Sequence, residues 1–390
     1  MALPTLSYEA LDPALQPALS RILTQAFKID AEVLEKEFQV LPHENWRVVR
    51  EPSGRVLGGL GILWMGQWYG GRNVPSAGIL CVGVSPECRG RGAARLLLSR
   101  MLLECRERGF PLSSLYPSNL PTYRKVGYEI AGLRHAFTLE TARIPDFGER
   151  SCTIIDAPPD EWEGLEPVLA AVREPFNARV ERTPALWKHR LGMLGKKAVY
   201  CFRFEWDGAP EAYVVYEQAD GKVNVRDAEA SSMRGARALW TFLRDHRSTI
   251  REVNWTGHPS SLLVRCLDTW PNSQMRVWPW MLRVVDPAAA LAARGYNRAV
   301  SGELHLDVLD GSVPELGGRV VLRAEGGVGT TAPGGDGTLK VHERALAALY
   351  GGALTASQLA WTGGVEGPQG AIDLADALFA GPQPFINDDF

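Results

Sequence analysis

Residues 82–94 combine a predicted strand with a turn that is rich in arginine and glycine. An alternating apolar run ends at Pro86 and predicts the strand, the turn reads Arg89-Gly90-Arg91-Gly92, and a helix is expected over 95–108. Glycine lets backbone approach a ligand closely. The first N–H groups of a helix lack internal partners and lie at the positive end of its dipole. Such a turn suits a pyrophosphate, and the arginines would add positive charge.

A tyrosine segment, Tyr123–Tyr128, follows the predicted helix. It has a tyrosine followed four residues later by glycine and an aromatic residue, and the earlier turn reads Arg-x-x-Gly-x-Ala. Together and in this order, the two patterns resemble the acetyl-CoA signature and a second hallmark of the GCN5-related N-acetyltransferases (GNAT superfamily). The residues that meet them are Arg89, Gly92 and Ala94, then Tyr123, Gly127 and Tyr128. The alternative is a surface turn beside a core tyrosine.

The chain of 390 residues is long enough for two or three domains. Residues 1–145 alternate helical and strand patterns, which predicts a mixed α/β sheet with helices packed on it. Residues 146–285 repeat the order strand, strand, helix, strand without either motif, so we expect a duplicated fold that lacks a cofactor site; an unrelated α/β domain is the alternative. Residues 286–390 change character, and their segment 345–352 resembles the sterol-carrier-protein-like C-terminal domain of the Eis-type acetyltransferases.

Periodicity and turn residues give approximate limits for the individual elements. The expected helices are 11–27, 30–38, 95–108, 162–172, 235–246 and 287–294. The expected strands are 46–49, 56–64, 113–116, 135–140, 198–206, 211–217, 223–229, 252–255, 302–307 and 319–323. The glycine-rich segment 325–337 predicts a hairpin loop, because it lacks the Gly-Lys-Ser/Thr ending of a phosphate-binding loop.

The whole chain is similar to the Eis family, and this resemblance implies both a fold and an activity. The fold would be α/β (α+β), with two tandem GNAT folds on mixed sheets and an α+β sterol-carrier-protein-like domain. Known members transfer acetyl from acetyl-CoA to primary amines, which include several amines of an aminoglycoside and a lysine side chain, and they assemble as homohexamers. Tyr123 would be the general acid, and the C-terminal carboxylate of Phe390 would be the general base.

The resemblance also indicates which residues contact acetyl-CoA. The predicted contacts are Val82, Val84, Arg89, Gly90, Arg91, Gly92, Ala93, Ala94 and Ser118. Gly90 stands where some relatives carry another arginine, which leaves less positive charge at the pyrophosphate.

The chemistry of amine acetylation requires an acid and a base independently of any resemblance. A primary amine has a pKa of about 10, so at neutral pH it must lose a proton before or during attack. The carbonyl oxygen needs donors, for which the backbone N–H groups of Val82–Val84 are candidates. The departing thiolate is best protonated, and Tyr123 carries a suitable O–H, although a core tyrosine is the alternative. No Cys–His or Ser–His pairing is evident, so direct transfer is expected.

The C-terminal run Phe385–Phe390 is aromatic at both ends and acidic between them. A free α-carboxyl has a pKa of about 3.5, a poor match for a base at neutral pH, and apolar surroundings would raise it. We expect this tail to be tucked into a site for a cationic substrate, with an ordinary disordered terminus as the alternative. Asp30, Glu37 and Asp389 are the predicted amine-binding residues. His43 and Glu44 are reserve candidates, and a solvated surface position is the simpler reading of those outside the tail.

Composition excludes several classes of function. The net charge of −3 and the lack of a dense basic run argue against nucleic-acid binding. No segment has the apolar length of a membrane span, and the N-terminus lacks the pattern of a signal peptide. Six cysteines without a Cys-x-x-Cys pair indicate reduced thiols and a cytoplasmic protein. The seven histidines show no metal-binding spacing, so no metal is predicted.

Two further groups have structural interpretations that we prefer. Trp278, Trp280 and Met281 could wall a cavity, but packing at a domain interface is expected. A set of arginines flanks 187–189 and could steer anions, but helix-surface pairs or an oligomer contact are expected. These arginines are Arg173, Arg179, Arg182 and Arg190. Two rival functions stay open: acetylation of a protein lysine, and a non-enzymatic module that binds an apolar ligand in its third domain.

Overall fold

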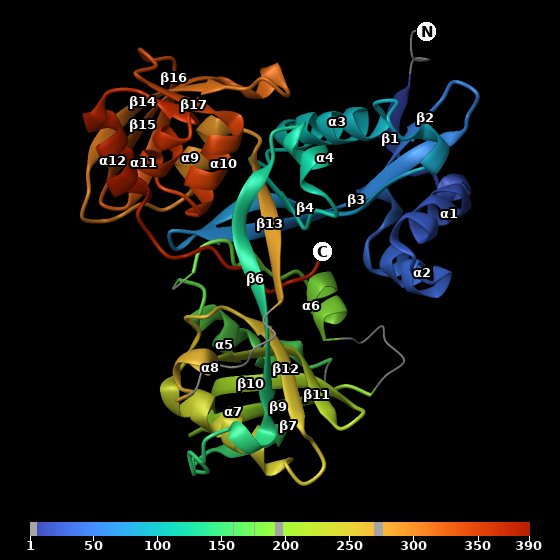
Figure 1. The fold of residues 1–390 in the computed structure, drawn as a ribbon, viewed down its shortest axis with the longest axis vertical. Helices are drawn as coiled ribbons and strands as arrows, with labels where there is room; N and C mark the ends of the chain where they lie inside the picture. The colour runs from blue at the N-terminus through green and yellow to red at the C-terminus, as the bar shows by residue number, and fades with distance from the viewer. Residues whose placement is uncertain (1–5, 159, 175, 192–197, 269–275) are drawn as a thin grey trace.

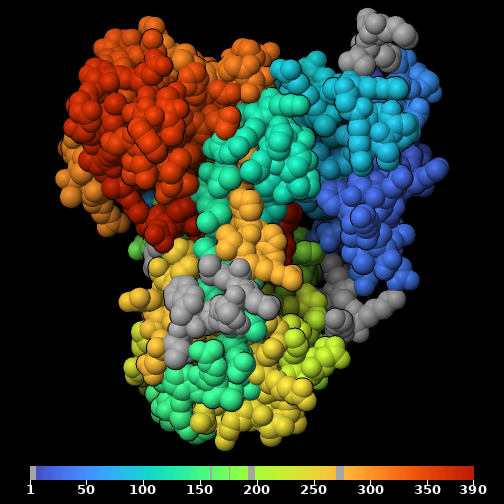
Figure 2. Space-filling model, viewed as in Figure 1, coloured from blue at the N-terminus to red at the C-terminus, as the bar shows by residue number. Residues whose placement is uncertain are grey.

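The computed structural model describes residues 6–158, 160–174, 176–191, 198–268 and 276–390. Figures 1 and 2 show three lobes, and Figure 1 shows two long central strands where the lobes meet. In the described part of the chain, thirteen strands form one mixed sheet that runs through the first two lobes, and five strands form a second sheet in the third lobe. The fold is therefore the mixed α/β class that the sequence predicts.

The first lobe is a sheet with helices on both faces. Its strands are β1 (Ser7–Ala10), β2 (Trp46–Arg50), β3 (Val56–Tyr69), β4 (Arg72–Val84) and β5 (Leu112–Leu115), in that order across the sheet. Its helices are α1 (Gln16–Phe27), α2 (Ala31–Val40), α3 (Ala93–Glu107) and α4 (Leu120–Arg124). The α3 crossover makes β5 parallel to β4, whereas β3 and β4 form an antiparallel hairpin. Apolar side chains of α3 pack on one face of the sheet and those of α1 and α2 on the other.

The second lobe repeats this plan. Its strands are β7 (Thr153–Asp156), β9 (Tyr200–Trp206), β10 (Ala209–Ala219), β11 (Lys222–Ala230) and β12 (Glu252–Gly257). Its helices are α5 (Glu166–Ala171), α6 (Pro184–Arg190), α7 (Met233–Asp245) and α8 (Leu262–Arg265). The short β8 (Val180–Glu181) pairs with β3 of the first lobe. The crossover through α7 makes β12 parallel to β11, as α3 does for β5 and β4.

Two long strands join the first two lobes into one sheet. Strand β13 (Arg276–Val284) returns from the end of the second lobe and lies between β5 and β6 (Glu129–Glu140). Strand β6 pairs with β13 along its first part and with β12 along 135–140. Trp280 and Met281 of β13 are buried as expected, whereas Trp278 is 42% exposed and does not fit the packing prediction.

The third lobe packs helices on the five-stranded sheet, in the order β16-β15-β14-β17-β18. Its strands are β14 (Gly302–Leu309), β15 (Gly318–Glu325), β16 (Val328–Pro333), β17 (Leu339–His342) and β18 (Val365–Glu366). Its helices are α9 (Pro287–Ala293), α10 (Glu343–Gly351), α11 (Ala356–Trp361) and α12 (Gln369–Phe379). The hairpin expected over 325–337 turns at Gly326 and Gly327, which have φ of 57° and 88°, but Val328–Pro333 of the predicted loop form strand β16.

The third lobe shares its core with the first. The rings of Tyr69 in β3 and Tyr350 in α10 meet edge to face with centroids 5.0 Å apart. The buried guanidinium of Arg294 donates to the carbonyl oxygen of Tyr350 at 2.6 Å, at the negative end of α10. The third lobe is thus docked on the first through a continuous apolar cluster.

The remaining global expectations concern membranes and cysteines. None of the helices in the described ranges combines the length and apolar character that a bilayer crossing requires. All six cysteines are free thiols, as the sequence predicts.

The close crossing of β6 and β13 can be tested at Gly132. A Cβ added there would lie 2.5 Å from Nε1 of the buried Trp280, so we expect Gly132→Ala to lower the free energy of unfolding by about 1–3 kcal/mol. Gly370→Ala is the matched control, because a Cβ at that exposed position of α12 meets nothing within 4 Å. Chemical denaturation of both variants measures the effect. Equal stability of both would contradict the tight packing at Gly132.

Candidate functional site

An extra residue in β4 opens a fork in the central sheet. The register of β3 and β4 shifts between Gly59 and Gly61, and Cys81 on β4 has a φ of 53°, in the left-handed region. These are the features of a β-bulge, which bends a strand away from its neighbour. The pairing of β4 with β5 accordingly ends at Ile79 and Leu115, and the two strands separate beyond that point.

The backbone of β4 beyond the bulge presents donors to this fork. The N–H of Ser85 donates to the carbonyl oxygen of Leu57 on β3 at 2.8 Å. Successive residues of an extended strand direct their N–H groups to opposite sides, so those of Val84 and Val82 face away from β3 and into the fork. These are the two strand residues predicted to contact acetyl-CoA.

The first turn of α3 has the properties of an anion site. Gly92 is its N-cap residue, with φ of 84°, and no side chain caps the free N–H groups. Arg89 and Arg91 are exposed, and neither forms an ion pair within the described ranges. Gly90, with φ of 75°, has open space where a Cβ would lie. A pyrophosphate fits this turn, because uncapped N–H groups and unpaired arginines both favour an anion there.

Tyr123 lies beside the fork on the short helix α4. The Asn119 side chain caps that helix by accepting from the N–H of Thr122 at 3.1 Å. Tyr123 itself is buried, and its hydroxyl is hydrogen-bonded to Ser118, another predicted contact. Burial raises the pKa of Tyr123 and outweighs the opposing effect of the Ser118 hydrogen bond. The phenol is therefore fully protonated at neutral pH.

The rest of the tyrosine motif shapes the turn after Tyr123. Gly127 has a φ of 85°, and a Cβ there would lie 2.8 Å from the guanidinium of Arg283. Tyr128 is buried, stacks edge to face on Tyr123 with centroids 6.2 Å apart, and its hydroxyl is 2.6 Å from that of Ser113 on β5. The motif thus fixes α4 against β5.

The bulge separates the surroundings of Tyr123 from those of the chain end. Val82 and Val84 contact the apolar cluster that contains Tyr123. Leu80 and Cys81, two consecutive residues, both contact the cluster that includes Phe390. The fork therefore lies between Tyr123 on one face of the sheet and Phe390 on the other.

The C-terminal tail is packed into the molecule. Phe385 and Ile386 are buried, and the chain end lies near α6, between the first two lobes (Figure 1). The N–H of Phe385 donates to the carbonyl oxygen of Asn177 at 2.7 Å, and the hydroxyl of Tyr116 donates to that of Ile386 at 3.3 Å. The Phe390 ring lies 5.8 Å from that of Tyr116.

A small cavity of about 30 Å³ lies beside Phe390. It is lined mainly by apolar side chains of α2, β3, β4 and α6, and by the carboxylates of Glu37 and Asp389. The Oε1 atom of Glu37 lies 3.1 Å from Nε2 of His189 on α6 of the second lobe. The cavity therefore joins the chain end to an acidic group of the first lobe.

Buried ion pairs hold the last residues of the tail. Arg182 is fully buried; its Nη1 lies 2.6 Å from Oδ2 of Asp227 and its Nε 2.6 Å from Oδ1 of Asp388. Arg190 lies 3.4 Å from Asp227 and 3.2 Å from Asp389, which also pairs with Arg134. Burial alone would raise the pKa of Asp227, but Arg182 and Arg190 hold it well below its usual range.

These contacts correct the preferred reading of the arginines around 187–189. Arg179, Arg182 and Arg190 are buried, and the last two bind the tail, so surface pairs were the wrong expectation for them. Charged residues are usually solvated, and nothing local links Arg182 to Asp388. The only available signal was charge complementarity between this basic segment and the acidic tail.

The predicted amine-binding residues divide into two groups. Glu37 and Asp389 meet at the cavity beside Phe390, with Asp389 already paired to arginines. Asp30 is exposed at the N-terminus of α2 and is not among the residues that line this cavity. His43 bonds to Gln16, and Glu44 is exposed. In the ranges described, no three His, Cys, Asp or Glu side chains are placed to hold a metal ion.

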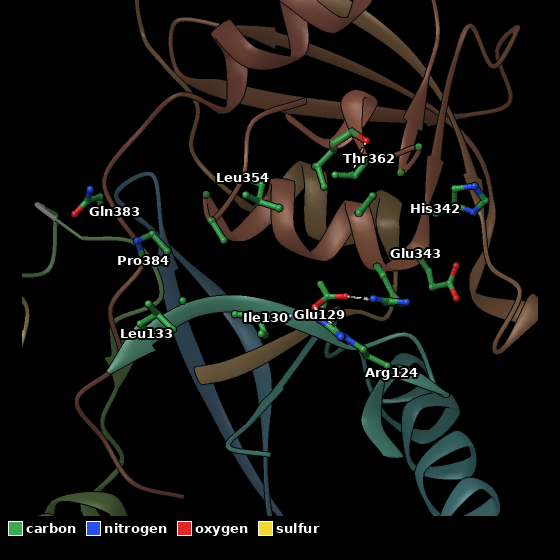
Figure 3. A pocket seen from close by; sticks show the side chains of 18 of the residues that line it. Arg124, Glu129, Ile130, Leu133, His342, Glu343, Leu354, Thr362, Gln383 and Pro384 are labelled. Carbon is green, nitrogen blue, oxygen red and sulfur yellow. Dashed lines mark hydrogen bonds and ion pairs between the residues drawn. The ribbon is translucent and has the colours of Figure 1, made fainter. Parts of the chain in front are cut away.

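A larger cavity of about 910 Å³ lies elsewhere, between β6 and helices α10 and α11 (Figure 3). Glu129 at its edge forms ion pairs with Arg124 and Arg344. Neither Tyr123 nor Phe390 lines it, so it is separate from the fork.

His258 packs against the tail, and its burial makes the stability of the folded protein depend on pH. Its ring lies 5.5 Å from that of Phe385, and its Nδ1 accepts from the N–H of Ser260 at 3.0 Å. Burial, aided by the nearby charges of His135 and Arg179, lowers the pKa of His258 to about 4. As pH falls, the imidazole of His258 is therefore protonated in the unfolded chain at a higher pH than in the folded protein.

We expect the native state to lose up to about 3 kcal/mol through His258 as pH falls from about 6.5 to about 4. His258→Asn removes this loss, because asparagine does not titrate. Thermal unfolding of wild type and variant across this range measures the difference. The exposed His342→Asn is the control and should keep the wild-type pH dependence. Parallel curves for wild type and His258→Asn would contradict the prediction.

Comparisons with known proteins agree with this geometry. Family models of the acetyltransferase (GNAT) domain match residues 9–131 and 178–284, and one of the sterol carrier protein domain matches 287–387. The crystal structure of a GCN5-related N-acetyltransferase from Anabaena variabilis is 31% identical, covers 99% of this chain and 100% of its own, and has a TM-score of 0.91.

Two curated relatives extend the comparison. An uncharacterized N-acetyltransferase of Streptomyces griseus is 29% identical over 82% of this chain and 83% of its own. N-acetyltransferase Eis of Mycobacterium tuberculosis is 27% identical over 74% of this chain and 73% of its own. The chain therefore belongs to the GCN5-related N-acetyltransferase family, as an acyltransferase of the Eis type with two acetyltransferase domains and a sterol carrier protein domain.

Proposed function

We propose that this protein transfers acetyl from acetyl-CoA directly to a primary amine, where the fork between β4 and β5 meets the end of the chain. The single observation that carries the proposal is the placement of Phe390 and Tyr123 on opposite faces of the sheet at this fork. An acid and a base on opposite sides of a reacting carbonyl are what acetyl transfer to an amine requires.

Acetyl-CoA would supply the thioester, and the first lobe offers groups to hold it. The uncapped first turn of α3, with Arg89 and Arg91, suits the pyrophosphate. Ala93 is buried, so its part would be its backbone N–H. The N–H groups of Val82 and Val84 would stabilise the carbonyl oxygen as it gains charge.

The charges around the tail favour the terminal carboxylate as the base. Asp227, Asp388 and Asp389 carry three negative charges, and Arg134, Arg182 and Arg190 match them with three positive ones. Among the described residues no cation is paired with the carboxylate of Phe390, and Phe390 and Glu37 line the same cavity. An ammonium group would be attracted there and would pass its proton to the carboxylate.

Tyr123 is the proposed acid. Its hydroxyl keeps its proton at neutral pH because burial raises its pKa, so it can donate to the departing thiolate. Ser118 would orient that hydroxyl through their hydrogen bond. No acyl-enzyme is needed in this scheme.

The acceptor is proposed to be an aliphatic amine of the polyamine, lysine or aminoglycoside type. The cavity beside Phe390 combines apolar walls such as Leu80 and Leu186 with the carboxylate of Glu37, which suits an alkylammonium group. Self-association, which the resemblance implies, is supported by exposed apolar side chains at Leu133, Val277 and Trp278. A cytoplasmic location is part of the same proposal.

Tyr123→Phe tests the acid. We expect kcat to fall about 100-fold while the KM for acetyl-CoA changes little, because the variant loses only a proton donor. Release of the CoA thiol measures turnover, and Tyr200→Phe, at an exposed site of the second lobe, is the matched control. Unchanged turnover in Tyr123→Phe would remove Tyr123 from this role.

Extension of the chain past Phe390 tests the base. Two added glycines move the carboxylate, so we expect thiol release with polyamines, aminoglycosides and lysine peptides to fall about 100-fold, while acetyl-CoA still binds. Two glycines added before Met1 form the control. Activity that survives the C-terminal extension would exclude the carboxylate as the base, and no activity of the unmodified protein on any acceptor would count against amine acetylation.

A further inference from the structure

The second acetyltransferase domain has filled its own anion site. Helix α7 corresponds to α3, but the Ser232 side chain caps it by accepting from the N–H of Gly235 at 3.0 Å. The carboxylate of Glu211 also lies there, bonded to Ser232 and to Nε of Arg234 at 2.8 Å. A pyrophosphate would meet a carboxylate instead of free N–H groups.

The second domain nevertheless keeps a fork like that of the first. Val215 on β10 pairs with Asp227 and Tyr216 with Val225, so β11 contains one extra residue, Arg226. The parallel pairing of β11 with β12 ends at Asn224. The bulge follows the last paired residue by two positions, as Cys81 follows Ile79 in β4.

The spacing gives Asp227 a counterpart in the first domain. Asp227 follows the bulge residue Arg226 directly, as Val82 follows Cys81. An apolar residue whose N–H faces the fork is thus replaced in the second domain by a buried carboxylate.

The tail of the same chain fills this second fork. The amide of Asn387 bridges the two strands: its Nδ2 donates to Oδ1 of Asp227 on β11 at 3.3 Å, and its Oδ1 accepts from the hydroxyl of Thr256 on β12 at 2.6 Å. Asp388 is buried against Arg182, which also holds Asp227.

We propose that the fork between β11 and β12 is a peptide-binding site whose ligand is the chain's own C-terminal segment, residues 385–390. The second domain thereby positions the Phe390 carboxylate of the first domain's site, with Asp227 as the central positioning residue. This functional consequence rests on the proposed role of that carboxylate, whereas the docking itself does not.

Charge explains why this segment docks here. A buried carboxylate needs ionic partners, and Asp227 has two in Arg182 and Arg190. Two arginines with one aspartate leave one positive charge, which Asp388 of the tail neutralises. The docking is therefore selective for an acidic residue at this position of the tail.

Carboxypeptidase A tests the docking without using the acetyl transfer reaction. It removes a C-terminal phenylalanine only from an accessible end, so mass spectrometry of Phe390 release reports how often the tail leaves the fork. We expect Asn387→Ala and Asp388→Ala to release Phe390 about 10- to 100-fold faster than wild type, because each loses buried polar bonds.

Asp245→Ala is the matched control. Asp245 pairs with Arg150 on the surface of the same domain, away from the tail contacts, so Phe390 release should stay at the wild-type rate. Thermal unfolding verifies that each variant is folded. Release from Asn387→Ala and Asp388→Ala at the rate of wild type and of Asp245→Ala would overturn the proposal.

Kinetics then separates the docking from the proposed chemistry. We expect Asp388→Ala to lower kcat/KM for the amine about 10-fold without changing the KM for acetyl-CoA, and to cause no further loss in the chain extended past Phe390. Lower activity with unchanged Phe390 release would overturn the docking. Faster release with unchanged activity would uphold the docking and reject the proposed role of the carboxylate.

Discussion

One extra residue in β4 is the constraint on which the candidate site depends. With Cys81 in the left-handed region, β4 cannot continue beside β5, and the sheet opens where backbone donors and two apolar clusters meet. A regular strand would close the fork with ladder hydrogen bonds and leave no place for a ligand. The same irregularity at Arg226 opens the second domain. The same kind of β-bulge thus gives the chain two forks, and different groups occupy them.

The two forks illustrate how charge decides what an open sheet binds. In the first, α3 is uncapped, and the preceding Arg89 and Arg91 form no ion pair within the described ranges, so an anionic ligand is favoured. In the second, Ser232 and Glu211 occupy the helix terminus, and Asp227 with Arg182 occupies the fork. A buried ionic cluster adds little net stability, because desolvation offsets its attraction. The cluster instead makes the docking of the tail specific, because only a segment of matching charge completes its ion pairs.

Much of the first site was predictable because its signals are local. The turn at Arg89–Gly92 and the segment Tyr123–Tyr128 lie within single stretches of chain, and backbone conformation there demands glycine. Helices α1–α3, α5, α7 and α9 and strands β2, β5, β9–β12, β14 and β15 were predicted to within about five residues, whereas short elements such as α6, α8, β1 and β7 were not predicted. The strand β13 was missed, and only 135–140 of β6 was expected, because both depend on partners distant in the sequence. The cluster at Arg182 and Asp388 was missed for the same reason: each residue alone looks solvated.

The position of β13 between β5 and β6 has a consequence for how the protein folds during its synthesis. On the ribosome, the first lobe emerges with a gap in its sheet that only residues 276–284 can close. The segment 385–390, which packs between the first two lobes, also follows all of these strands in the sequence. The first lobe therefore cannot complete its sheet before the second lobe has been synthesised, so folding of this chain does not proceed lobe by lobe from the N-terminus.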